Sequence, residues 1–419
     1  STHCISSAAS DVYKRQVPDD SLAGKKMILE LEGVYHNAEV WVGEQKVMFR
    51  PYGYTNFYTD LTACLELGVK NRIRVIARNA DQPNSRWYSG AGIYRPATLW
   101  VGDAAHILLN GVRVRTLSVS PAKVEVTVKT SGPGAVKVEI CDGGKVVAET
   151  SESDGKVVTA ATAESDGTVT MVLEVPDAKL WSVDTPCLYT CHVTFGGDEC
   201  RESFGIRSLS WGDKGFCING ERVILQGACI HHDNGLLGAV CDVDAVERKV
   251  RLLRETGYNA LRSAHNPCSK VLLDACDRQG MLVMDEYIDH WYIHKTEYDY
   301  VPYFEEWWRR DLADMVEKDY NHPCVVLYST GNEVSETAQA RGISLMREMT
   351  DFLHGLDDSR PVTCGINIFF NFLSSIGFGV YSDKKAKKEA DRAEKAAKAG
   401  KTSKKKAVGS QFFNNLAGL

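Results

Sequence analysis

The stretch NHPCVVLYSTGNEVSE, from Asn321 to Glu336, decides the fold of this chain. Its apolar run from Cys324 to Tyr328 is short and contains β-branched residues, which is typical of a strand buried on both faces in a parallel sheet. Asn332 and Glu333 follow where such a strand would end, and in a barrel of alternating strands and helices this end carries the chemistry. Glu333 could also begin the next helix, because acidic residues favour a first helical turn. The surrounding sequence has to decide between the two.

The alternation of strand and helix continues on both sides of this stretch. Apolar runs predict strands at RVILQG, NALRSA, MLVMDE and VVLYS, and a fifth near Val362. Between them, helical patterns are predicted at 243–255, 269–279 and about 303–318, with another that ends near Leu356. This order indicates a parallel sheet, and the lack of a GxGxxG turn favours a barrel over a dinucleotide-binding fold.

Polar side chains occur at the ends of four successive strands of this predicted sheet. They are His231, His232 and Asp233, then Arg262 and His265, then Asp285 and Glu286, and finally Asn332 and Glu333. The carboxyl ends of parallel strands meet at one edge of a barrel, so these side chains are expected to lie close together. Four clusters in register favour a functional site over a helix start at Glu333.

The first half of the chain is predicted to be all-β. Short alternating runs over 17–104 predict a jelly-roll sandwich, and those over 105–208 predict an immunoglobulin-like sandwich that serves as a brace. Two loops of the first sandwich, 50–62 and 86–100, are dense in aromatic residues and glycine. Such loops suit stacking against sugars, but packing at the ends of the sandwich is the favoured interpretation.

Composition limits the classes of partner. The 419 residues are 44% hydrophobic and 25% charged, with a net charge of −6, which argues against nucleic acid as the main partner. No apolar run in the sequence is long enough to span a bilayer, so no membrane partner is expected. Thirteen cysteines without metal-finger spacing favour a reducing compartment, hence a cytoplasmic protein, with a periplasmic or secreted location left open.

The two ends of the sequence look different from the rest. Residues 1–16 show no periodicity and are expected to be unstructured or an artefact of the reading frame. The segment 383–410 holds ten Lys and one Arg against four acidic residues, with alanine as its main apolar residue. It is expected to form a solvated, Lys-rich insertion, because it offers no apolar face to bury.

From Val17 to Cys364 the sequence resembles glycoside hydrolase family 2, the group of β-galactosidases and β-glucuronidases. The loops PYGYTNFYTDLT and GAGIYRPATLW resemble the sugar-binding domain of that family, and NALRSAHNP resembles its signature around an Arg and a His. These two residues are Arg262 and His265 here. YSTGNEVSE resembles the segment that carries the acid/base Glu, at Glu333, after a substrate-binding Asn, at Asn332.

The resemblance implies a multidomain protein of β plus α/β class. A jelly-roll β-sandwich and an immunoglobulin-like β-sandwich would precede a (β/α)8 TIM barrel, of which 209–419 would be the N-terminal part. Glu333 would be the catalytic acid/base, and Asn332, His265, Arg262 and His231 would bind the substrate. The nucleophile would lie on a later barrel strand, beyond Leu419, so the chain alone is expected to be inactive.

Two departures from the family pattern affect the site. Large bacterial β-galactosidases hold magnesium partly through a Glu and a His after the third strand, whereas MDEYIDHWYIH has Asp289 at the Glu position and no matching His. No metal and no cofactor are therefore expected. The family also has Arg-His-Glu after the first strand, where this chain has Ile230, His231 and His232. His231 is aligned with the family's His and is expected to contact sugar.

The implied activity is that of a retaining exo-β-glycosidase that removes terminal β-linked sugars. β-Galactosidase is the expected activity, and β-glucuronidase or a non-catalytic carbohydrate-binding fragment are the alternatives. The expected partner is a β-glycoside oligosaccharide or glycoconjugate, and the full-length protein could be a homo-oligomer.

Overall fold

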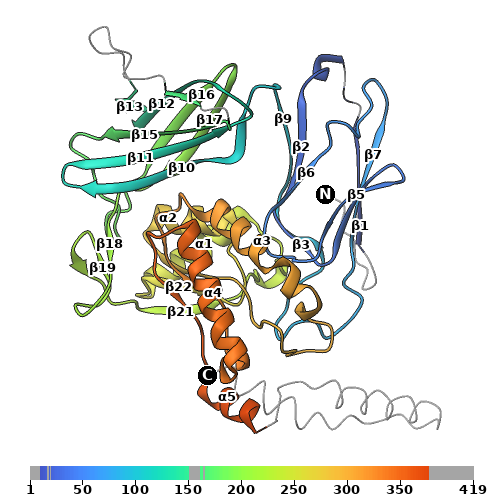
Figure 1. Cartoon of the computed structure of the whole chain (residues 1–419), viewed down its shortest axis with the longest axis vertical. Helices are drawn as coiled ribbons and strands as arrows, with labels where there is room; N and C mark the ends of the chain where they lie inside the picture. Colours follow the sequence, from blue (N-terminus) through green and yellow to red (C-terminus); the bar gives the residue numbers. More distant parts are fainter. Residues whose placement is uncertain (1–9, 17, 19, 151–160, 164–165, 377–419) are drawn as a thin grey trace.

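The computed structural model describes residues 10–16, 18, 20–150, 161–163 and 166–376. Figure 1 shows three parts: a blue β-sandwich that contains the first strands, a teal and green β-sandwich, and a yellow to red part in which helices pack on a parallel sheet. The predicted segment 383–410 lies outside the described residues. No helix of the described part is both long and apolar enough to cross a membrane. The fold class predicted from the sequence, multidomain β plus α/β, is confirmed.

The first sandwich contains three antiparallel groups of strands, in the orders β1-β7-β4-β5, β6-β2-β9 and β3-β8. Its elements are β1 (Ser10–Gln16), the 3-10 helix η1 (Asp20–Leu22), β2 (Lys26–Leu31), β3 (Val34–Tyr35), β4 (Ala38–Val42), β5 (Gln45–Arg50), β6 (Phe57–Asp60), β7 (Asn71–Ala77), β8 (Gly92–Ile93) and β9 (Ala97–Gly102). Its core is formed by alternate residues of these strands, such as Leu31, Val40 and Val75.

The prediction that residues 1–16 lack structure is wrong for 10–16. Strand β1 pairs antiparallel with β7, from Ser10 opposite Ala77 to Gln16 opposite Asn71. The segment was missed because it carries no clear alternation of its own, and pairing with β7 supplies the backbone hydrogen bonds that make it a strand.

The second sandwich packs two antiparallel sheets face to face. Its strands are β10 (Ile107–Val119), β11 (Ala122–Thr130), β12 (Gly134–Asp142), β13 (Lys145–Glu149), β14 (Ala161–Ala163), β15 (Thr168–Glu174), β16 (Tyr189–Phe195) and β17 (Asp198–Phe204). One sheet has the order β10-β11-β15 and the other β13-β12-β16-β17, with β14 paired to β12. Every second residue of β11 is buried, so Val124, Val126 and Val128 share a core with Val138 and Ile140.

The third part contains the alternating strands and helices that the sequence predicted. A small sheet of β18 (Leu209–Ser210), β19 (Cys217–Ile218) and β20 (Glu221–Arg222) leads into five parallel strands in the order β21-β22-β23-β24-β25. These strands are β21 (Gly227–Ile230), β22 (Ala260–Ser263), β23 (Leu282–Glu286), β24 (Val325–Ser329) and β25 (Val362–Thr363). The helices are α1 (Val243–Glu255), α2 (Lys270–Gln279), α3 (Val301–Asp319), α4 (Ala340–Leu356) and α5 (Ile368–Ser375), with 3-10 turns η2 (Gly235–Leu237) and η3 (Ser335–Ala338).

Local signals explain where two of these helices begin and end. The Asp242 carboxylate accepts a hydrogen bond from Ala245 N at the start of α1, and the Ser269 hydroxyl accepts one from Leu272 N at the start of α2. Gly280 ends α2 with φ 67°, in the left-handed region that glycine adopts without strain. The two helices match their predicted bounds closely for this reason.

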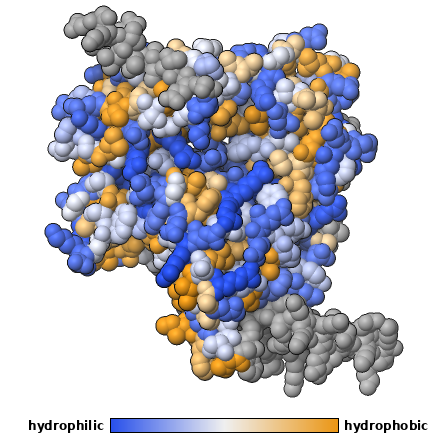
Figure 2. Space-filling model, in the orientation of Figure 1, coloured by the Kyte–Doolittle hydropathy of each residue, from blue (hydrophilic) through white to orange (hydrophobic). Residues whose placement is uncertain are grey.

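Helix α5 leaves an apolar surface exposed. Ile368, Phe369, Phe372 and Ile376, on or next to α5, are each more than half exposed. Figure 2 shows this apolar surface at the lower end of the view, where α5 lies in Figure 1.

An ion pair from the first sandwich is buried against the barrel helix α3. Arg50 is 0% exposed, and its Nη2 lies 2.8 Å from Asp311 Oδ1 and 2.8 Å from Asp314 Oδ2. The hydroxyls of Tyr287 and Tyr300 each donate to Asp311 at 2.8 Å. Tyr52 and Tyr54 belong to the same core as the barrel residues, so this aromatic loop serves packing, as the sequence favoured.

Candidate active site

Glu333 lies just after strand β24 and does not begin a helix. Its φ is 45°, in a left-handed conformation that is uncommon for a residue with a side chain, and η3 starts only at Ser335. The carboxylate is 26% exposed. Asn367 Nδ2 donates to its Oε1 at 2.9 Å, and Arg86 Nη1 donates to its Oε2 at 3.4 Å. The alternative that Glu333 is a helix start is therefore wrong.

Asn332 is held from both ends of its side-chain amide. Arg262 Nη2 donates to Asn332 Oδ1 at 2.7 Å, and Asn332 Nδ2 donates to Asp289 Oδ1 at 2.8 Å. Lys295 Nζ also donates to the Asn332 backbone carbonyl at 2.7 Å. One hydrogen of the Asn332 amide is left for a ligand, since an amide nitrogen carries two.

Glu286 holds two of the predicted site residues, Arg262 and His265, in place. It is fully buried, and Arg262 reaches it through Nε at 3.0 Å and through Nη2 at 2.8 Å. His265 Nδ1 lies 2.8 Å from Glu286 Oε1, and Ser329 Oγ donates to Glu286 Oε2 at 2.7 Å. This charged, planar contact fixes the direction of the Arg262 guanidinium.

His231 lies at the edge of the site and touches it through ring contacts. Its ring stacks on Trp87 at 5.7 Å between centroids and meets the edge of His265, also at 5.7 Å. Burial lowers the pKa of His231, with repulsion by His265 acting in the same direction, so the imidazole is neutral near pH 7. The structure thus brings together all five predicted site residues, although His231 is the most peripheral.

Two other members of the strand-end clusters turn away from the site. His232 packs between the rings of Tyr54 and Tyr94, and burial lowers its pKa to about 3. Asp285 is fully buried and accepts a hydrogen bond from Cys268 N at 2.9 Å. Successive side chains of a strand point to opposite faces, so only every second residue can reach the barrel interior.

Three residues that the sequence did not single out as site residues complete the site. Arg86 comes from the first sandwich and binds Asp289 through Nε at 3.0 Å and Nη2 at 2.5 Å. Lys295 Nζ lies 3.0 Å from the same carboxylate. Although burial alone would raise the pKa of Asp289, Lys295 and Arg86 hold it well below its ordinary value. Asp289 is thus a buried carboxylate between two cations.

A fourth missed residue, Asn367, has two roles. Its Oδ1 accepts from Phe369 N at the start of α5, and its Nδ2 donates to Glu333. The sequence signals for these residues were the aromatic loop that contains Arg86, the place of Asp289 at the Glu position of the family pattern, and the helix-start residue type of Asn367. Lys295 had no signal, because a loop lysine is usually solvated.

A pocket beside this site encloses about 510 Å³, part of it open to solvent, between the first sandwich and the barrel. Arg86, Trp87, His265, Asp289, His290 and Thr296 are among its lining residues. Trp87 Nε1, both ring nitrogens of His290 and Thr296 Oγ1 have no hydrogen-bond partner among the described residues.

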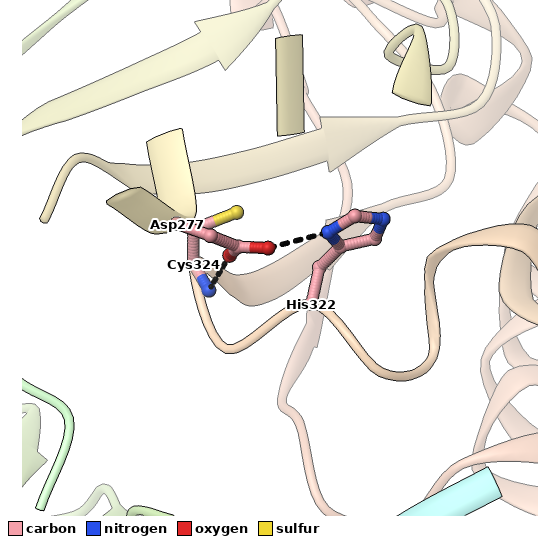
Figure 3. Close-up of side chains that lie close together, drawn as sticks. All are labelled: Asp277, His322 and Cys324. Atoms are coloured by element: carbon pink, nitrogen blue, oxygen red, sulfur yellow. Dashed lines mark hydrogen bonds and ion pairs between the residues drawn. The ribbon is translucent and has the colours of Figure 1, made fainter. Parts of the chain in front are cut away.

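One group of possible metal ligands in the described part of the chain lies away from this site and links two elements of the fold. Asp277, His322 and Cys324 bring their ligand atoms within 4.8 Å of one another. Figure 3 shows the Asp277 carboxylate between His322 Nδ1, at 2.5 Å, and the backbone N of Cys324, at 2.9 Å. Burial raises the pKa of the Cys324 thiol, whereas a metal needs the thiolate. The group links the end of α2 to the start of β24.

The comparisons with known proteins identify a family. Two family profiles match, "Glycosyl hydrolases family 2, TIM barrel domain" over 210–412 and "Glycosyl hydrolases family 2" over 106–207. The chain is 38% identical over 390 residues to the beta-galactosidase BoGH2A of Bacteroides ovatus, a match that covers 83% of this chain and 46% of that protein. A beta-glucuronidase of Bacteroides fragilis is 25% identical over 371 residues, with 82% and 52% covered.

Among solved structures, a glycosyl hydrolase family 2 member from Bacteroides cellulosilyticus superposes with a TM-score of 0.80 at 36% identity, over 88% of this chain and 49% of that one. The chain thus spans about half the length of these relatives. The two profile matches, the sequence identity and the shared fold lead to one conclusion: the chain belongs to glycoside hydrolase family 2.

Proposed function

We propose that the chain carries the acid/base half of a retaining β-glycosidase active site, with β-galactosides as substrates. One observation supports this most directly. Glu333 presents a partly exposed carboxylate at the carboxyl end of β24, oriented by Asn367 and Arg86 and next to the well-fixed amide of Asn332. A surface carboxylate without a function would not require four polar side chains to orient it and its neighbour.

In this proposal Glu333 protonates the departing glycosidic oxygen and then removes a proton from the attacking water. Asn332 donates its remaining amide hydrogen to a sugar hydroxyl, an interaction that strengthens in the transition state. Arg262 and His265, both held by Glu286, orient further hydroxyls of the sugar.

A retaining reaction needs a second carboxylate as nucleophile, and we expect it on a barrel strand downstream of the described residues. Glu286 is a poor candidate because Arg262, His265 and Ser329 already occupy its oxygens. Asp289 is similarly engaged by Arg86 and Lys295. We therefore expect turnover to depend on that downstream part of the barrel.

A neutral sugar fits the described part of the site better than a uronic acid. Arg262 is paired with Glu286, and Arg86 and Lys295 are paired with Asp289. A uronate carboxylate would require a cation that is not already neutralised. Relatives of the chain include both a beta-galactosidase and a beta-glucuronidase, so the choice is tested by assaying full-length protein on nitrophenyl β-galactoside and nitrophenyl β-glucuronide. Faster turnover of the glucuronide would reject the proposed sugar.

The role of Glu333 is tested by Glu333→Gln in the full-length protein. We expect kcat to fall by about 100-fold or more on glycosides with poor leaving groups, which need a proton for departure. Activated aryl glycosides should lose much less, because they leave without protonation. Equal losses on both kinds of substrate would contradict the acid/base assignment.

A further inference from the structure

The region after strand β23 does not fit the magnesium that large bacterial β-galactosidases hold there. A divalent hard cation needs several free oxygen ligands, mostly carboxylates, carbonyls and water. Here the carboxylates of Asp289, which follows β23, and of Glu333, which follows β24, are both in contact with side-chain cations. These two carboxylates are thus already engaged by cations of the protein itself.

Lys295 is surrounded as a bound cation would be. Its side chain is 3% exposed, and Nζ contacts Asp289 Oδ1 at 3.0 Å, the Asp289 carbonyl at 2.5 Å and the Asn332 carbonyl at 2.7 Å. An ammonium group carries three N–H donors, so these three oxygens satisfy it completely. The contacts join the loop after β23 to the backbone directly before Glu333.

Arg86 joins the two carboxylates themselves. Its Nε and Nη2 bind Asp289 as a fork, and its Nη1 lies 3.4 Å from Glu333 Oε2. The side chain is 17% exposed, and the carboxylate of Asp289 is 3% exposed, so water screens this group of charges little. Two cations and two carboxylates balance one another, and an added divalent ion would face both cations at short range.

We propose that Arg86 and Lys295 take the place of a divalent cation and make this site independent of metal. Lys295 is a positioning residue for Asp289 and for the backbone of Asn332, and Arg86 is a positioning residue for Glu333. The positioning of Glu333 by Arg86 rests on the proposed function of Glu333. The inference that the site is independent of metal does not. The proposal also makes the first sandwich part of the active site, since Arg86 belongs to that domain.

The inference that the site is independent of metal is tested on the 419-residue chain, without any assay of turnover. Titration of MgCl2 and MnCl2 into protein treated with EDTA should give no saturable heat, and the thermal midpoint should be the same in EDTA and in Mg²⁺. Saturable binding of one ion per chain with a Kd below about 100 µM would overturn the proposal, provided that the variant Asp289→Asn abolishes it. Binding that survives Asp289→Asn would be elsewhere and would leave the proposal standing.

The positioning role of Arg86 is tested in the full-length protein with Arg86→Met, which keeps about the same side-chain volume and removes the charge. We expect kcat on poor leaving groups to fall by about 100-fold, with a much smaller loss on activated aryl glycosides, as for an impaired acid/base. Arg86→Lys should recover part of that kcat, and the control Arg78→Met, which removes an exposed arginine of the same domain, should not change it. A rise in KM with unchanged kcat would show that Arg86 only binds substrate and would overturn the positioning role.

Glu333→Gln, assayed beside Arg86→Met, separates this inference from the proposed function. If Glu333→Gln shows no dependence on the leaving group, the acid/base assignment fails, and the positioning role of Arg86 fails with it. If Glu333→Gln shows that dependence and Arg86→Met does not, only the positioning role is rejected.

Discussion

Arg50 and Arg86 both extend from the first sandwich to an aspartate of the barrel, yet their surroundings are opposite. Arg50 is one cation between two carboxylates, Asp311 and Asp314. At the other contact Asp289 is one carboxylate between two cations, Arg86 and Lys295. Arg50 is completely buried, whereas Arg86 reaches the partly exposed Glu333.

The pKa values of Asp311 and Asp289 shift in opposite directions, because the ratio of cations to carboxylates is opposite at the two contacts. Burial raises the pKa of Asp311 to about 6, because Arg50 and two tyrosine hydroxyls do not offset it fully and Asp314 adds repulsion. The pKa of Asp289 is held well below its ordinary value, although burial acts against this. The number of cations for each carboxylate, more than depth alone, therefore decides the direction in which the pKa of each aspartate shifts.

The comparison predicts that Arg50→Met is the more damaging substitution for stability. It would leave Asp311 and Asp314 facing each other without a cation in a buried place, and we expect a loss of about 3–5 kcal/mol in the free energy of unfolding at pH 7. Chemical denaturation followed by tryptophan fluorescence measures it. A loss no larger than that of Arg78→Met, which removes an exposed arginine, would show that the Arg50 contact is not stabilising.

A second prediction concerns pH, with opposite signs at the two aspartates. Asp311 has a raised pKa, so the folded state binds its proton more tightly, and this stability is present below about pH 4 and lost as pH rises through about 6. The loss is about 3 kcal/mol. Asp289 has a lowered pKa, so its contribution is present above about pH 4 and is lost as pH falls further.

Stability measured from pH 3 to 7 in Asp311→Asn and Asp289→Asn separates the two aspartates. Asp311→Asn should remove the decline between pH 4 and 6, and Asp289→Asn should reduce the loss in acid. If Asp311→Asn leaves the decline between pH 4 and 6 unchanged, a different group binds that proton.

The smallest expected effect is that of Arg86→Met on stability. Asp289 would keep Lys295 and the Asn332 amide, so it would not become an unpaired buried charge. We expect a loss of about 2 kcal/mol, clearly below that of Arg50→Met in the same denaturation experiment. A loss equal to that of Arg50→Met would show that Asp289 depends on Arg86 as strongly as Asp311 depends on Arg50, and would remove the contrast.

The order of strands and helices in the barrel part could be predicted because its signals are local. Helix α1 has its Asp242 cap, α2 has Ser269 and Gly280 at its ends, and β24 is a continuous apolar run. The strand β1 could not be predicted in this way, since its partner β7 is more than fifty residues away. Local patterns do not record such pairings.

The candidate site was predicted only where its residues lie at or just after the end of a strand. Asn332, Glu333, Arg262 and His265 do so, and they meet as expected. Arg86, Lys295 and Asn367 come from loops and a helix start, and only the tertiary fold brings them to Glu333 and Asp289. The sequence groups His232 and Asp285 with the site because they stand next to site residues at the strand ends. Neighbouring side chains of a strand point to opposite faces, so these two point away from it.

The backbone at Glu333 has a consequence for how this position tolerates change. A φ of 45° disfavours any residue with a side chain by roughly 1 kcal/mol or more relative to glycine, and asparagine suits it better than glutamate. A library randomised at this codon and sorted only for thermal resistance should therefore enrich glycine and asparagine. Sorted for turnover of a β-glycoside, the same library should return glutamate, so the two screens would move the sequence in opposite directions at one residue.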